Sequence, residues 1–150
     1  MLKIISNNLI KQIIITYYFK GKDIEDVQRK AEYFSKNYLQ SILREKALEK
    51  ISWHKSNGHT IVIVSASIDL WLKPWCEQNG IILISTMLEV KDQIITGKTF
   101  KKNCYGLEKV KRIQELYNLS DYHYIYAYGN SRGDREMLGI ASEPHYKPFI

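Results

Sequence analysis

Apolar side chains recur at every fourth position over residues 2–19, a spacing that favours an amphipathic helix. The run 13–19 within this segment is rich in β-branched and aromatic residues, which favours a strand, so both structures stay open. Gly21 then breaks the pattern, and Asp23 is a suitable N-cap for a helix that runs to about Leu39. The pattern therefore predicts a small helical unit at the N-terminal side of the chain.

From Arg44 onward, segments with helical periodicity alternate with short apolar runs. The predicted helices are 44–56, 68–78, 107–117 and 134–140, and the predicted strands are 60–64, 81–84 and 123–128, with a hairpin at 87–97. The first two of these helices each end in Asn-Gly, a pair that readily adopts the left-handed conformation of a helix C-cap. Apolar strands separated by helices predict an α/β fold with a parallel sheet, whose ligands bind at the carboxyl ends of its strands.

The composition is that of an ordinary globular domain. The 150 residues are 45% hydrophobic and 12% aromatic, which excludes a disordered chain. The net charge of +6 comes from basic residues scattered along the chain, so no nucleic-acid partner is expected. No apolar run is long enough to span a bilayer, and Cys76 and Cys104 are too few for a disulfide framework or a zinc site. We therefore expect a soluble cytoplasmic protein with reduced thiols and no membrane partner.

Three features carry side chains suited to binding an anion or a metal. Ser65-Ala66-Ser67 follows the first predicted strand, where a hydroxyl beside the N–H groups of a helix N-terminus can hold an anion. The loop 129–134, Gly-Asn-Ser-Arg-Gly-Asp, follows the third predicted strand and offers side-chain oxygens to a metal. Lys109 lies early in a predicted helix, where it opposes the helix dipole; taken alone it also fits a surface lysine. The four histidines show no pair at ligand spacing and are expected to pack or lie at the surface.

Together and in this order, these features resemble the motifs of the haloacid dehalogenase-like (HAD) superfamily, in particular its phosphoserine-phosphatase-like branch. The resemblance covers residues 47–149, and its matching segments are 61–67 as the second motif, 106–109 as the third and 128–138 as the fourth. The fourth is the most specific, because the family pattern is Gly-Asp-Ser-x-x-Asp followed by Met-Leu. The resemblance implies a Rossmann-like doubly wound parallel sheet, here residues 44–150, with part of a helical cap in residues 1–43.

The resemblance also implies a Mg²⁺-dependent phosphatase and gives roles to individual residues. Ser65, with Ala66 beside it, would hold the transferring phosphoryl group, and Lys109 would stabilise its negative charge. Asn130 would ligate Mg²⁺, and Asp134 would support that metal site. The expected ligand is a small phosphorylated metabolite.

The sequence departs from the family pattern at two points. In the family, an Asp-x-Asp at the end of an apolar strand supplies the nucleophile and the acid–base group, and these 150 residues contain no Asp-x-Asp. Asn130 stands where the family has aspartate, which removes a negative charge from the metal site. The lysine also has a rival place in some family members, just before the glycine, where this chain has Tyr105; we assign it to Lys109.

These departures lead us to expect a truncated or degenerate family member that is inactive alone and binds Mg²⁺ weakly or not at all. Two alternatives stay open. One is an active phosphatase completed by a separate N-terminal piece, and the other is a non-catalytic phosphate-binding or interaction module.

The resemblance further implies that the strand bearing the absent motif is the first, central strand of the sheet, between 60–64 and 123–128. Without it, both neighbours keep a row of unpaired backbone groups along one edge. We expect the gap to be filled by direct pairing of the two strands, by insertion of the run 13–19, or by a strand of another chain. Self-association is therefore expected.

Overall fold

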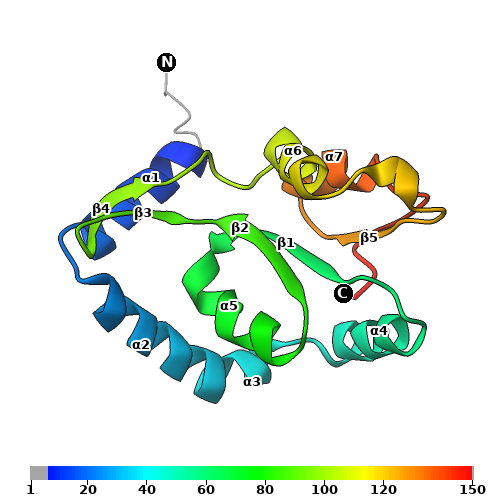
Figure 1. Cartoon of the computed structure of the whole chain (residues 1–150), viewed down its shortest axis with the longest axis horizontal. Helices are drawn as coiled ribbons and strands as arrows, with labels where there is room; N and C mark the ends of the chain where they lie inside the picture. The colour runs from blue at the N-terminus through cyan, green and yellow to red at the C-terminus, as the bar shows by residue number, and fades with distance from the viewer. Residues whose placement is uncertain (1–6, 150) are drawn as a thin grey trace.

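The computed structural model describes residues 7–149, which form a mixed α/β fold (Figure 1). Its helices are α1 (Asn7–Phe19), α2 (Ile24–Phe34), α3 (Gln40–Ile42), α4 (Glu45–Ser56), α5 (Asp69–Gln78), α6 (Leu107–Leu116) and α7 (Arg135–Leu138). Its strands are β1 (Val62–Ile68), β2 (Ile82–Thr86), β3 (Leu88–Lys91), β4 (Ile94–Thr99), β5 (Tyr126–Gly129) and β6 (Glu143–Tyr146). A π-helical turn (Ser35–Leu39) joins α2 to α3, and short 3₁₀ turns occupy Leu119–Asp121 and Arg132–Asp134.

The N-terminal segment is helical despite the β-prone composition of 13–19, but Leu9, Ile13 and Tyr17, which carry the four-residue spacing, are exposed rather than buried. Residues 2–6 of the predicted helix lie outside the described residues. In α1, Ile15 is only 1% exposed and belongs to the same buried cluster as Ile95 of β4. Because one apolar face of the helix is buried against the hairpin, the run 13–19 is not the strand that fills the predicted gap.

The link between α1 and α2 pairs with β4. The amide of Gly21 donates to the carbonyl of Ile95 at 2.9 Å, and the amide of Ile95 donates to the carbonyl of Lys22 at 2.9 Å. Asp23 then caps α2 as predicted, because its carboxylate accepts hydrogen bonds from the amides of Glu25 and Asp26. The predicted helical unit is therefore tied to the β3–β4 hairpin, which lies much later in the sequence.

The strands form three two-stranded sheets within residues 7–149. β1 pairs with β2 in parallel, β5 pairs with β6 in parallel, and β3 and β4 form the predicted hairpin. In Figure 1, β1, β2 and α5 lie in the middle, with α1 and the hairpin on one side and α6, α7 and β5 on the other. The expected continuous parallel sheet is not formed by these residues.

The predicted bounds of β1 and β5 differ most from the structure, and β6 was not predicted. β1 runs through Ile68 with a bulge between Ser65 and Ile68, so Ser65, Ala66 and Ser67 belong to the strand and α5 begins only at Asp69. β5 begins at residue 126 rather than 123. β6 escaped prediction because its sequence, Glu-Pro-His-Tyr, has neither an apolar run nor clean alternation.

Two apolar clusters bury the helices. The first joins α1, α2 and α5 to the hairpin. The second contains Trp75, Cys76 and Ile81, and apolar residues of β1 and β2 pack against it. Both cysteines are buried free thiols, and burial raises the pKa of Cys76 to about 11. None of the helices in the described part of the chain is long and apolar enough to cross a membrane.

Candidate functional site

A cavity of about 440 Å³ lies where the carboxyl ends of β1 and β5 face each other. Its lining includes all five residues that the sequence singled out for binding: Ser65, Ala66, Lys109, Asn130 and Asp134. A second cavity of similar size lies at the C-terminal end of α6, and none of those five residues lines it. The structure thus gathers the candidate residues from β1, α6 and the loop after β5 around one cavity.

Lys109 is buried, with its side chain 6% exposed, so the surface-lysine interpretation is wrong. Its ammonium donates to the carbonyl of Val64 at 2.6 Å and to Oδ1 of Asp134 at 2.8 Å. The buried face of α6 is therefore partly polar, whereas the apolar Leu116 of the same helix is 62% exposed. Lys109 consequently links β1 to the loop that follows β5.

Asp134 organises that loop. Its Oδ2 accepts hydrogen bonds from the amide of Asn130 at 3.1 Å, and from the amide and hydroxyl of Ser131 at 2.9 and 2.7 Å. Burial alone would raise the pKa of Asp134, but the hydrogen bonds from Lys109 and Ser131 outweigh it and hold the pKa below its ordinary value. The carboxylate is therefore an anion whose two oxygens are both engaged by the protein.

Close packing explains the two glycines of the loop. A Cβ on Gly129 would lie 2.5 Å from Cβ of Asp134, and a Cβ on Gly133 would lie 2.3 Å from the ring of Tyr105. Tyr105, the rival position for the family lysine, thus fills space against the loop and lines the cavity, while the ammonium that reaches Asp134 comes from Lys109.

Ser65 lies inside β1 rather than at a helix N-terminus, which corrects the local geometry expected from the sequence. Its Oγ accepts a hydrogen bond from the amide of Ser67 at 3.0 Å. A serine hydroxyl has one hydrogen to donate, and no acceptor for it is present among the residues that the structure describes. The hydroxyl oxygen of Ser65 thus accepts from Ser67, and the hydroxyl hydrogen can donate to a ligand in the cavity.

The charges around the cavity favour an anion. Among residues 7–149, Arg44, Lys109 and Lys147 line it together with one carboxylate, that of Asp134. Arg44 also donates to the carbonyl of Phe149 at 2.6 Å, which holds the last described residues beside the cavity. Three cations facing one anion leave a positive excess that attracts oxyanions.

The residues present do not fit the Mg²⁺ ion that the resemblance implies. Magnesium binds carboxylate oxygens, but both oxygens of Asp134 are occupied by Lys109, Ser131 and the loop amide of Asn130. No group of three or more metal-binding side chains occurs within residues 7–149. Asn130 supplies at most one neutral oxygen.

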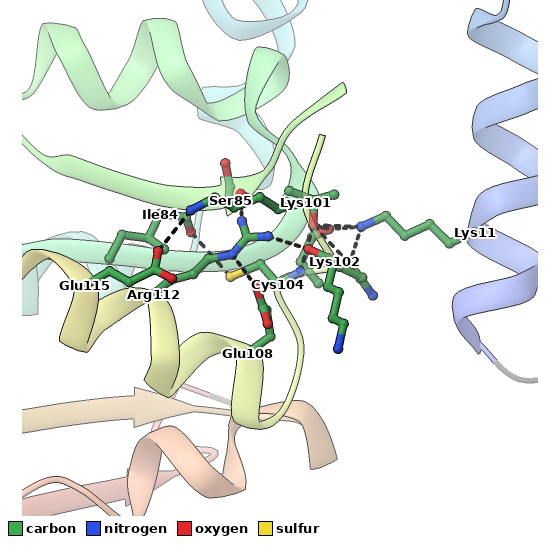
Figure 2. A network of polar contacts seen from close by, with 12 residues as sticks. Lys11, Ile84, Ser85, Lys101, Lys102, Cys104, Glu108, Arg112 and Glu115 are labelled. Atoms are coloured by element: carbon green, nitrogen blue, oxygen red, sulfur yellow. Dashed lines mark hydrogen bonds and ion pairs between the residues drawn. The ribbon is translucent and has the colours of Figure 1, made fainter. Parts of the chain in front are cut away.

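A buried polar network beside the cavity was not predicted (Figure 2). Arg112, 6% exposed, donates to the carbonyls of Ser85 and Lys102 and to Glu108 at 3.1 Å, and so ties α6 to β2 and to the following loop. Lys11 of α1 reaches the same region. An arginine or lysine among many in a basic chain gives no sequence signal of burial, because burial depends on contacts distant in sequence.

His54 packs in the interior and His59 lies at the surface, as expected, but the contact between their rings was not predicted. Nδ1 of His54 lies 2.8 Å from Nδ1 of His59, and Nε2 of His54 lies 3.0 Å from the hydroxyl of Tyr128. The rings of Trp53 and Tyr126 pack against the pair. This aromatic cluster joins α4 to β5, and the five-residue spacing across a helix end was its only sequence signal.

β1 and β5 each use one edge for pairing. Within residues 7–149 the other edge of each strand has no strand partner, so the two strands do not pair directly with each other. None of the residues 62–67 of β1 is fully buried, although the sequence Val-Ile-Val is that of a core strand. The site therefore lies between two open strand edges.

Comparison with known proteins identifies the family. Residues 4–139 match the family model of haloacid dehalogenase-like hydrolases. The chain is 33% identical over 142 residues to protein CicA of Caulobacter vibrioides, an alignment that covers 93% of this chain and 64% of CicA, so the chain spans less than two thirds of that relative.

Solved structures show the same fold. A Bordetella pertussis Tohama I protein of unknown function superposes with a TM-score of 0.81 at 19% identity, over 92% of this chain and 64% of that chain. A phosphoserine phosphatase, solved as a phospho-aspartyl intermediate analogue, superposes with a TM-score of 0.56 at 26% identity, over 91% of this chain and 63% of that chain. The family model, which matches most of the sequence, settles the assignment: the chain belongs to the haloacid dehalogenase-like hydrolase family.

Proposed function

We propose that this chain binds the phosphoryl group of a small phosphorylated metabolite in the cavity between β1 and β5, and that these 150 residues alone do not hydrolyse it. The proposal rests on one observation. The buried ammonium of Lys109 lies in the wall of a cavity that two further cations, Arg44 and Lys147, also line. Family membership and the superposition on a phosphoserine phosphatase support a phosphate ester as the ligand class.

The donors of the cavity suit an oxyanion. A lysine ammonium has three N–H groups, and the contacts with Val64 and Asp134 use two, which leaves one for a ligand oxygen. The hydroxyl hydrogen of Ser65 provides a second donor. Charge-assisted hydrogen bonds of this kind are the strong ones in proteins.

Turnover needs a nucleophile that these residues do not supply. Covalent phosphoryl transfer in the family runs through the Asp-x-Asp aspartate, which does not occur in the sequence. Asp134, whose carboxylate lines the cavity, is paired with Lys109 and hydrogen-bonded to its own loop. Binding without hydrolysis is therefore the expected behaviour of this chain.

Calorimetry with inorganic phosphate tests the proposal. We expect wild type to bind with a Kd of about 1 mM or tighter, and Ser65→Ala to bind about tenfold more weakly, because it loses a hydrogen bond to a charged ligand. Ser52→Ala, at an exposed position on α4, is the matched control and should bind as wild type does. Absence of binding by wild type, or equal binding by Ser65→Ala, would contradict the proposal.

The open edges of β1 and β5 favour a second candidate, a phosphatase completed by an added strand. Fusing a segment that ends an apolar strand in Asp-x-Asp ahead of Met1 tests it. Mg²⁺-dependent release of phosphate from an aryl phosphate, lost when the first aspartate becomes asparagine, would support completion. No release by a folded fusion would count against it.

We also propose that Mg²⁺ binding by this chain is weaker than about 1 mM, since both oxygens of Asp134 are engaged and the side chain of Asn130 offers only a neutral oxygen. Asn130→Asp should strengthen it by restoring a carboxylate. Calorimetry on both proteins tests this. A wild type that binds Mg²⁺ more tightly than about 1 mM would contradict the proposal.

A further inference from the structure

Lys11 makes an unusual contact for a lysine in the middle of a helix. From α1 its ammonium donates to the carbonyl of Ala66 on β1, to Oγ1 of Thr86 at 3.1 Å and to Oδ1 of Asn103 at 2.5 Å (Figure 2). Thr86 is fully buried, and its Oγ1 also lies 3.0 Å from the carbonyl of Ala66. All three N–H groups of the ammonium are thus engaged, and Lys11 does not line the cavity.

The carbonyl that Lys11 holds belongs to the peptide unit that orients Ser65. The carbonyl of Ala66 and the amide of Ser67 are the two ends of one planar peptide group. The oxygen end accepts from Lys11, and the N–H end donates to Oγ of Ser65 at 3.0 Å. A positive charge at the oxygen polarises the peptide and strengthens the hydrogen bond made by its N–H.

This arrangement fixes the hydrogen-bonding role of the Ser65 hydroxyl. Because its Oγ accepts from the amide of Ser67, its hydrogen is left to point elsewhere, and the cavity lies beside it. If the peptide rotated, Ser65 would lose that acceptor role and the fixed direction of its O–H. The contact also connects the helical N-terminal segment to the cavity across 55 positions of sequence.

We propose that Lys11 is a positioning residue for the phosphoryl site: its ammonium fixes the Ala66–Ser67 peptide, so that Ser65 presents its hydroxyl hydrogen to the bound oxyanion. The donation from Ser65 to an oxyanion rests on the proposed function. The fixing of the Ala66–Ser67 peptide by Lys11 does not depend on it. The contact that Lys11 of α1 makes with β1 and β2 is thereby coupled to anion affinity.

The charge of Lys11 changes within an accessible pH range. Burial lowers the pKa of Lys11 to about 8. Cys104 raises this pKa by a smaller amount, and Arg112 lowers it further. Burial also raises the pKa of the Cys104 thiol. Loss of the Lys11 proton is therefore expected to relax the peptide that Ser65 depends on as pH rises through about 8.

Amide NMR of the full chain from about pH 6.5 to about pH 9.5 tests this inference, with sulfate as the anion because its charge is constant over that range. In wild type the Ser67 amide should follow a one-proton transition near pH 8, and sulfate affinity should fall across the same range. In Lys11→Met the transition should vanish and affinity at low pH should drop about fivefold. Lys46→Met, at an exposed position on α4, is the control and should behave as wild type does.

Lys11→Arg separates charge from fold, since arginine stays charged over the whole range. It should keep more affinity than Lys11→Met and show no transition near pH 8. A Ser67 amide that does not titrate in wild type, or Lys11→Met binding sulfate like Lys46→Met, overturns the inference. A wild type that binds no sulfate while its Ser67 amide titrates overturns the proposed function alone. If Lys11→Met does not fold, the wild-type titration and Lys11→Arg decide.

Discussion

The part of the molecule built from α1, α2 and the β3–β4 hairpin differs from the part built around β1 and β5 in how its apolar residues are covered. Ile15 and Ile95 are 1% and 0% exposed in the first part. In the second, residues 62–67 of β1 are all partly exposed, and one edge each of β1 and β5 lacks a partner within residues 7–149.

We call the first part the closed side, because its helices and hairpin meet in a buried apolar cluster, and the second the open side, because polar contacts join β1 to the loop after β5. In the first part, helix and hairpin come from distant segments yet share backbone hydrogen bonds and a buried apolar cluster, although Ile13 and Tyr17 of α1 stay 56% and 80% exposed. In the second, a buried ion pair between Lys109 and Asp134 spans the space between β1 and the loop after β5. The candidate binding residues lie on the open side. Lys11, from the closed side, contacts the peptide that orients one of them, Ser65.

The largest effect should come from breaking the link across the open side. Lys109→Met leaves the buried carboxylate of Asp134 without its cation, which should lower the free energy of unfolding by about 3–5 kcal/mol. Urea denaturation measures it, with the exposed Lys111→Met on the same helix as control. The double variant Lys109→Met with Asp134→Asn should recover part of the loss. A single variant as stable as the control would contradict the structural role of the pair.

Matched truncations on the two sides sharpen the comparison. Ile95→Ala removes a fully buried side chain of the closed part and should cost about 2–5 kcal/mol. Ile63→Ala, on the partly exposed β1, should cost about half as much, because less apolar area leaves water there on folding. Equal losses in urea denaturation would show that β1 is covered as fully as the hairpin.

The open edges should also make the chain associate with itself. Sedimentation velocity at increasing concentration is expected to show wild type moving from monomer to larger species. Val62→Lys places a charge on β1, which natural edge strands use to block pairing, and should weaken association about tenfold. A wild type that stays monomeric and melts in one cooperative step would contradict this expectation and show that the edges are covered otherwise.

The smallest effect concerns pH at the aromatic cluster that joins α4 to β5. Burial, followed by the charges of His59 and Lys50, lowers the pKa of His54. The unfolded chain then binds a proton at His54 more readily than the folded chain, so stability is fully present above about pH 6.5 and is lost as pH falls through the folded pKa.

Thermal melting at about pH 7.5 and about pH 5.5 measures this loss. The melting temperature of wild type should fall by a few degrees, and that of His54→Phe by less. His123→Phe, at an exposed position, is the control. The same fall in His54→Phe as in wild type would place the pH dependence elsewhere.

Local signals in the sequence predicted much of the fold and the gathering of the site residues. Asp23 caps its helix, and the Asn-Gly pairs end theirs with Gly58 and Gly80 at positive φ, because these are short-range backbone preferences. Local patterns do not decide between helix and strand for residues 13–19, because β-prone composition competes with helical spacing; the contact with the hairpin favours the helix.

What escaped prediction depends on contacts between distant segments. The burial of Arg112 and the contact of Lys11 with Ala66 follow from how helices dock, which no local pattern encodes. The extension of β1 through Ile68 escaped because polar residues end an apolar run in the sequence while the backbone pairing continues. The family resemblance indicated Ser65 and Lys109 as binding residues, but not the peptide that holds Ser65.

Phosphorus NMR of the purified chain mixed with an aryl phosphate and Mg²⁺ tests the central claim most directly, because one spectrum reports both binding and hydrolysis. We predict that the phosphate ester resonance shifts or broadens with added wild type, returns toward its free position with Ser65→Ala, and yields no inorganic phosphate. An unchanged ester resonance would contradict the binding claim. An inorganic phosphate signal that grows with wild type and disappears in Ser65→Ala would contradict the claim that these 150 residues bind without turnover.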